Sequence, residues 1–329
     1  MQNTVSRKLT YYSFFFSLMI ANYHWNTYNS QFEDLFFSYR VLSDISKYFG
    51  SLAMAYYFFI SGYLLYRNSS IDNWMTKIKN RVWSLLIPCM LWNFITFFLV
   101  YWKTPFTVVS LREFIKGIAI EPFDGPLWYM IAVFSLLAFL PFCVRCRWLL
   151  LIVALYGHYL FQPLLGKVAW AGNLIYYLPA YCIGGFIGSY HKKETVFRIQ
   201  QIISIVLFLV FSILYLVCHA AGDLKKWIIL ASPVVIWGII PDSVFKKDPP
   251  FAVSISFFIY AMHAGRVIPF VRKTILPHLV IMTSSGSALV LQRALLILLT
   301  YLIIYCLTVI LKCILPNKLF SLLSGGRIQ

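Results

Sequence analysis

The chain has 329 residues, of which 60% are hydrophobic and only 12% are charged. A soluble domain carries about 25% charged residues, and at this length it could not hide so much apolar surface from water, whereas a bilayer can. The net charge of +17 does not indicate nucleic-acid binding, because no basic aromatic patch or finger motif accompanies it.

Ten apolar runs follow one another along the chain, and most approach the roughly 20 residues that a helix needs to cross hydrocarbon. Backbone polar groups in hydrocarbon need internal partners, and the alternation of a barrel strand is absent, so the runs predict helices. The sequence therefore predicts an all-α, polytopic integral membrane bundle of about ten transmembrane helices, as a single domain over residues 1–329. The runs are residues 9–28, 48–66, 82–102, 127–143, 148–165, 174–190, 202–219, 227–240, 252–271 and 288–315.

An even number of spans places both termini on one side of the membrane. Putting the termini in the cytoplasm assigns slightly more than half of the 28 Lys and Arg residues to inner connectors, a modest bias in the expected direction. We therefore expect cytoplasmic termini and a location in the plasma membrane.

The first polar candidate in chain order is His24, near the end of the first run. On a helix it shares a face with Ser17 and Ser13, and with the small residue Ala21, so it is expected to point into the bundle. Ionisable groups in hydrocarbon are costly and are functional candidates by default. An interfacial histidine that bonds a neighbour is the alternative.

The next candidates lie in the second run and before the third. Ser61 and Gly62 form a small pair inside a span, typical of either close helix packing or a polar site. Lys79 and Arg81 stand before a hydrophobic stretch. They are either a basic membrane anchor or a clamp for phosphates, since such cations make strong charge-assisted bonds to them.

A turn then enters the fourth run, and it carries Asp124 and Trp128. These two residues are candidates for an acceptor pocket, and an interfacial anchor is the alternative for Trp128. Cys143 and Cys146 form a single CxxC pair without a second pair or a nearby histidine, so no metal site is predicted.

The last candidates lie in the ninth run, where Arg266 follows His263 by three residues and so shares its helix face. Two such groups on one face suit a hydrated cavity or an anionic ligand. The alternative is that the helix ends near Met262 and that both groups lie at the membrane interface.

These residues lie in blocks whose order and spacing resemble the acyltransferase-3 family of integral membrane acyltransferases over nearly the whole chain. No single block is specific. The blocks are the first run ending in His24 and residues 58–64 (FFISGYL), 79–88 (KNRVWSLLIP), 125–129 (GPLWY), 178–188 (LPAYCIGGFIG) and 256–263 (SFFIYAMH).

The resemblance implies transfer of an acyl group, commonly acetyl from cytoplasmic acetyl-CoA, to a hydroxyl of a cell-surface or lipid-linked glycan. It implies His24 as the leading catalytic residue, with His263 second. A neutral imidazole is suited to removing the proton of a sugar hydroxyl, and covalent transfer through His24 is the alternative. The donor acyl-CoA is a substrate, so no permanently bound cofactor is expected.

The sequence departs from the family at Ser13, where members often carry an arginine eleven residues before the histidine. Another cation must then hold the donor, and Arg81, with Lys79, is the first candidate and Arg266 the second. For the acceptor site the candidates are Trp128, Asp124, Ser61 and Tyr260.

Two other functions fit a polytopic chain. A transporter or flippase for an amphiphile or glycan lipid would move substrate without consuming a thioester, and it commonly has an inverted repeat, which we do not find here. A glycan polymerase or ligase usually has large outer loops, whereas the longest outer connector here covers only residues 103–126.

Overall fold

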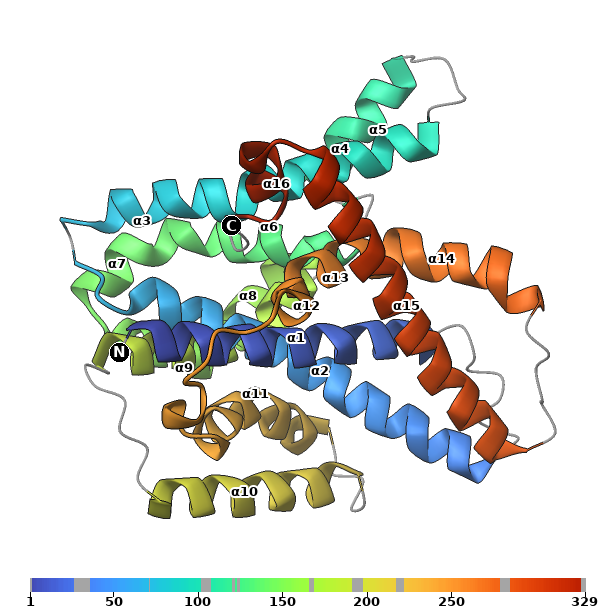
Figure 1. The fold of residues 1–329 in the computed structure, drawn as a ribbon. Helices are drawn as coiled ribbons and strands as arrows, with labels where there is room; N and C mark the ends of the chain where they lie inside the picture. Colours follow the sequence, from blue (N-terminus) through green and yellow to red (C-terminus); the bar gives the residue numbers. More distant parts are fainter. Residues whose placement is uncertain are drawn as a thin grey trace.

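The computed structural model describes residues 2–26, 36–70, 72–101, 108–119, 122, 125–165, 169–190, 198–216, 222–278 and 285–326. Every regular element in these ranges is a helix or a helical turn (Figure 1). The α-helices are α1 (Gln2–Asn26), α2 (Phe37–Tyr66), α3 (Trp74–Arg81), α4 (Ile87–Tyr101), α5 (Val108–Ala119), α6 (Trp128–Ser135), α7 (Leu140–Arg145), α8 (Trp148–Leu165), α9 (Ala169–Tyr190), α10 (Arg198–Leu216), α11 (Gly222–Ile239), α12 (Phe251–Ser254), α13 (Ser256–Met262), α14 (Ile268–Phe270), α15 (Gly286–Ile314) and α16 (Asn317–Leu323).

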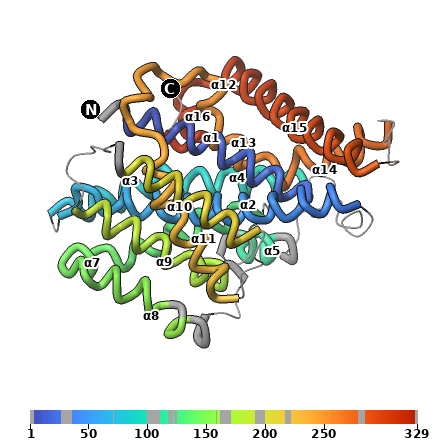
Figure 2. The backbone as a smooth tube through the Cα atoms, turned by 90° about the horizontal axis from the view of Figure 1, so that it is seen from below, coloured from blue at the N-terminus to red at the C-terminus, as the bar shows by residue number. Residues whose placement is uncertain are grey.

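Helices α1 and α2 form the centre of the bundle. Helix α2 contacts α1, α9, α11 and α15, and α1 also contacts α13 and α15. In Figure 1, α15 crosses the ends of α1 and α2 obliquely. Figure 2 shows α7 and α8 on one edge of the bundle and α15 on the opposite edge, with α1 and α2 between them. This arrangement brings the first helix of the chain against two of the last.

Glycines allow α2 and α9 to approach with backbone in contact with backbone. A Cβ added to Gly62 would lie 2.0 Å from the Tyr181 carbonyl oxygen, and one added to Gly184 would lie 2.0 Å from that of Phe59. No side chain fits at these distances, and small residues at helix interfaces are the usual means of close packing in membranes. Close packing therefore explains Gly62.

Three prolines of the described chain are each preceded by a widened, π-helical turn. The turn η2 (Val82–Leu86) precedes Pro88, η6 (His263–Val267) precedes Pro269, and η7 (Val271–Ile275) precedes Pro277. In each case the residue before the proline donates its N–H to a carbonyl five residues earlier. A proline ring collides with the carbonyl of the preceding turn of a regular α-helix, and the wider turn relieves this collision. Such turns are frequent at functional sites.

Where the structure describes them, all ten predicted apolar runs lie in helical segments, so the prediction of an all-α membrane bundle is confirmed. By length and composition, four segments of the described chain are long and apolar enough to span a membrane, and the count of about ten stays a prediction. Helices α3, α5 and α16 lie outside the predicted runs. The four segments are Phe37–Tyr66, Trp74–Leu99, Gly125–Arg145 and Gly286–Ile314.

Candidate active site

Two histidines from opposite ends of the chain meet inside the bundle. His24 lies in the last turn of α1, and His263 is the first residue of η6. Their ring centroids are 5.0 Å apart, at an interplanar angle of 54°. His24 is half-buried, whereas His263 is fully buried. Helical structure therefore continues past Met262, and the His263 side chain is enclosed by protein.

The hydrogen bonds of His263 fix its tautomer. Its Nδ1 lies 2.8 Å from the Ile259 carbonyl oxygen and 2.9 Å from that of Tyr260. A carbonyl oxygen only accepts, so Nδ1 carries the proton and Nε2 keeps its lone pair. Among the described residues, no group bonds this Nε2. A buried imidazole with an open lone pair is equipped to accept a proton.

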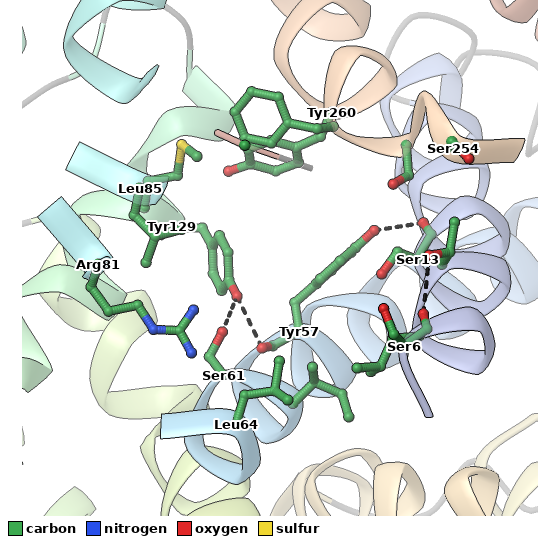
Figure 3. Close-up of a pocket in the computed structure, with 17 residues that line it drawn as sticks. Ser6, Ser13, Tyr57, Ser61, Leu64, Arg81, Leu85, Tyr129, Ser254 and Tyr260 are labelled. Carbon is green, nitrogen blue, oxygen red and sulfur yellow. Dashed lines mark hydrogen bonds between the residues drawn. The ribbon is translucent and has the colours of Figure 1, made fainter. Parts of the chain in front are cut away.

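A cavity of about 360 Å³ lies alongside α1 (Figure 3). Its volume is in the range of small-molecule sites. It lies among α1, α2, the segment around η2, α6 and α13, and its Ser6 and Gly326 come from the two terminal parts of the chain. The described residues that line it are Ser6, Leu9, Thr10, Ser13, Tyr57, Ile60, Ser61, Leu64, Arg81, Leu85, Tyr129, Met130, Ser254, Ser256, Phe257, Tyr260 and Gly326.

Three tyrosines form one wall of this cavity. The rings of Tyr57, Tyr129 and Tyr260 have centroids between 5.9 and 6.5 Å apart. The Tyr129 hydroxyl is 2.6 Å from Ser61 Oγ and donates to the Tyr57 carbonyl oxygen at 2.9 Å. Tyr57 in turn donates to the Ser13 carbonyl oxygen at 2.7 Å. These bonds hold the wall in one arrangement.

Tyr260 connects the cavity to the histidines. Its ring lines the cavity, and its centroid is 6.4 Å from that of His263. Its hydroxyl donates to the Pro126 carbonyl oxygen, which fixes the ring across the gap between α13 and the turn Gly125–Leu127. The predicted acceptor residues Ser61 and Tyr260 are thus both cavity residues, and one of them contacts His263.

Arg81 is the one charged side chain among the described residues of the cavity lining, and its guanidinium points into the cavity in Figure 3. The other predicted donor cations lie elsewhere. Lys79 is exposed to the outside of the bundle. Arg266 donates to the carbonyl oxygens of Ala261 and Trp92, at 2.6 and 2.9 Å, and also to Thr96. Its guanidinium therefore joins η6 to α4.

Trp128 is not brought to the cavity. The ring of Trp128 stacks on those of Phe58 and Tyr177, with centroids 5.9 and 6.5 Å away, and Trp128 is absent from the described lining. Asp124 lies outside the residues that the structure describes. The structure thus groups His24 with His263, and Arg81 with Ser61 and Tyr260.

Sequence reasoning missed one polar group beside His24. Arg293 of α15 is 1% exposed and bonds Asn22 and Asn26 of α1. The signal was present, because Arg293 stands inside the last apolar run and the two asparagines, four residues apart, flank His24. What the sequence did not show is that these residues meet.

A family model described as an acyltransferase domain matches residues 14–317 of this chain. Both histidines, Arg81, the three tyrosines and Arg293 fall within the matched range. No curated protein matches the chain, and no solved structure does.

Proposed function

We propose that this chain, which belongs to that acyltransferase family and is a membrane acyltransferase, moves an acetyl or other short acyl group from acyl-CoA to a hydroxyl. The acceptor is a cell-surface or lipid-linked glycan, and the membrane is the plasma membrane. The proposal rests above all on one observation, the contact between the rings of His24 and His263 next to a tyrosine-walled cavity with one arginine.

The reaction needs a base, because a sugar hydroxyl is a poor nucleophile at neutral pH. An imidazole of the pair accepts the hydroxyl proton while the hydroxyl oxygen attacks the thioester carbonyl carbon. The C–O bond of the new ester forms, the C–S bond breaks, and the proton passes to the leaving thiolate. In the covalent variant His24 takes the acyl group first and the hydroxyl attacks it second.

The cavity suits the donor. Arg81 would hold phosphate oxygens of acyl-CoA through charge-assisted hydrogen bonds. The hydroxyls of Ser6, Thr10, Ser13 and Ser61 give the lining polar partners for the amides of the pantetheine arm. Since the lining includes residues near both termini, a cytoplasmic position of the termini would open the cavity to the cytoplasmic donor pool.

The donor must reach past the cavity to the histidines. Ser13 and His24 are separated along α1 by about 16 Å, at 1.5 Å per residue. Tyr260 lies between the cavity and His263, so the thioester would pass this ring. The acceptor hydroxyl would then approach the His24 end of α1 from the outer face or from lipid.

A label-transfer experiment tests this function. Purified protein in lipid is given radiolabelled acetyl-CoA and a glycan-lipid extract, beside His24→Ala and the matched control His278→Ala, an exposed histidine. We expect label in the extract with the unmodified chain and with His278→Ala, and its loss with His24→Ala. Transfer that survives His24→Ala would shift the base role to His263. Folded protein that transfers no label to an extract containing the acceptor would favour a transporter or flippase.

A further inference from the structure

Arg293 of α15 is a buried cation in the interior of the bundle, where it bonds residues of the last two turns of α1. Its Nε donates to Asn22 Oδ1 at 2.8 Å, and its two terminal nitrogens donate to the Asn22 carbonyl oxygen at 2.7 Å and to Asn26 Oδ1 at 2.6 Å. Burying a charge is costly unless it is well hydrogen-bonded. The planar guanidinium meets this need by bridging one full turn of α1.

The two asparagines are themselves fixed by α2. Asn22 Nδ2 donates to Ser46 Oγ at 3.1 Å, and Asn26 Nδ2 donates to Ser43 Oγ at 2.6 Å. Each amide therefore gives its oxygen to Arg293 and its nitrogen to a serine. The guanidinium, the two amides and the two hydroxyls form one connected group that joins α15, α1 and α2.

This group lies on the face of α1 opposite to His24. Residues two positions apart on an α-helix point in nearly opposite directions, so Asn22 and Asn26 face α15 and α2 while His24 faces η6. Helix ends lack half of the usual backbone bonds, and α1 ends at Asn26. Without the bonds from Arg293, only the two asparagine–serine bonds to α2 would remain in this side-chain group to set the rotation of the last turn.

We propose that Arg293 is a positioning residue, which acts through Asn22 and Asn26 to hold the last turn of α1 so that the His24 ring faces His263. This inference rests on the proposed function for its effect on turnover, but the placement of the ring is measurable without any turnover. Arg293 itself contacts neither the cavity nor His263 in the described interactions.

The kinetic test compares Arg293→Met with Thr300→Val. Thr300, also on α15, is buried and accepts a 3.0 Å bond from Trp25 Nε1, so the control removes a buried hydrogen bond between the same two helices. For Arg293→Met we expect kcat to fall about 100-fold, the scale of a misplaced catalytic group, with KM for acyl-CoA nearly unchanged. Thr300→Val is expected to stay within about twofold of the unmodified chain. Equal losses in the two variants would overturn the proposal.

A double-mutant cycle separates positioning from general damage. If Arg293 acts only through His24, then Arg293→Met lowers the residual transfer of His24→Ala by less than about twofold. A full 100-fold loss in that background would mean that Arg293 acts independently of His24. Arg293→Lys, which keeps the charge but not the planar fork, is expected to recover only part of kcat.

A spectroscopic test does not depend on the reaction. In protein labelled with ¹⁵N-histidine, the His24 signals are identified by their absence in His24→Ala. We expect them to shift or broaden in Arg293→Met and to stay in place in Thr300→Val. Unchanged His24 signals in folded Arg293→Met would refute the positioning role. If the signals shift in Arg293→Met but even the unmodified chain transfers no label, the positioning role is upheld and only the proposed function is refuted.

Discussion

The rings of His24 and His263 lie 5.0 Å apart, centroid to centroid, although one residue lies in the last turn of the first helix and the other is the first residue of a π-helical turn late in the chain. The two rings differ in what holds them. His263 is anchored by two carbonyl oxygens through Nδ1 and has its Nε2 lone pair open among the described groups. His24 lies in the last turn of α1, whose Asn22 and Asn26 bond Arg293.

Replacing either histidine by alanine is expected to lower acyl transfer by about 100-fold or more, the usual size of a general-base contribution. His24→Ala removes the imidazole on α1, and His263→Ala removes the imidazole whose Nε2 is bonded by no group in the described part of the chain. Initial rates of label transfer measure both. If His263→Ala keeps full activity, His263 is a packing residue and His24 acts without it.

Arg81→Gln is expected to raise KM for acyl-CoA about tenfold with little change in kcat, because loss of one charge-assisted bond to phosphate costs about 1.5–3 kcal/mol at most. The matched control is Lys79→Gln, two residues away and exposed, for which KM should change less than about twofold. Initial rates at increasing donor concentrations give both parameters. Equal effects of the two variants would show that the basic segment acts by charge alone and not through the cavity.

Arg266→Met should lower stability and leave the donor KM unchanged. The guanidinium bonds the Ala261 and Trp92 carbonyl oxygens, so its loss removes bonds between η6 and α4 at a cost of about 2 kcal/mol. The thermal unfolding midpoint in detergent is the measurement, with the exposed Arg272→Met as control. A raised donor KM at normal stability would instead indicate that Arg266 binds the donor.

Gly184→Ala is expected to destabilise the bundle by about 1–3 kcal/mol or more, since the new methyl group would collide with backbone that cannot move aside as a side chain can. Its Cβ would lie 2.0 Å from the Phe59 carbonyl oxygen. Gly222→Ala is the control, because a Cβ there meets nothing within 4 Å. Similar unfolding midpoints for the two variants would contradict the close packing of α2 against α9.

The sequence predicts helix positions well where apolar residues dominate. Residues 148–165 were predicted as one run, and α8 covers the same residues. The second run was predicted from residue 48, but α2 begins at Phe37, because Ser43 and Ser46 on its first turns are buried and find partners on α1. From the sequence alone, polar residues such as these predict a connecting loop and not a buried helix.

The site was predicted residue by residue, without its grouping. His24 and His263 were each singled out as costly polar groups in a span, but nothing in the sequence placed them in contact. Arg81 was the first candidate for the donor cation and Arg266 the second, and only the structure assigns one to the cavity and the other to helix packing. Arg293 was not predicted as a site residue. The free-energy cost of burying its charge is offset by hydrogen bonds to two amides of α1, a helix far away in the chain.

The sequence by itself determined that the chain is a helical membrane protein, because hydrophobicity and helical hydrogen bonds depend on residues close together in the chain. Only the tertiary structure decided which polar groups meet. In lipid, helices associate through van der Waals packing and interhelical hydrogen bonds, and both depend on surfaces formed by distant segments. The contact of α2 with α9 at Gly62 and Gly184, that of Arg293 with α1, and that of His24 with His263 are all of this kind.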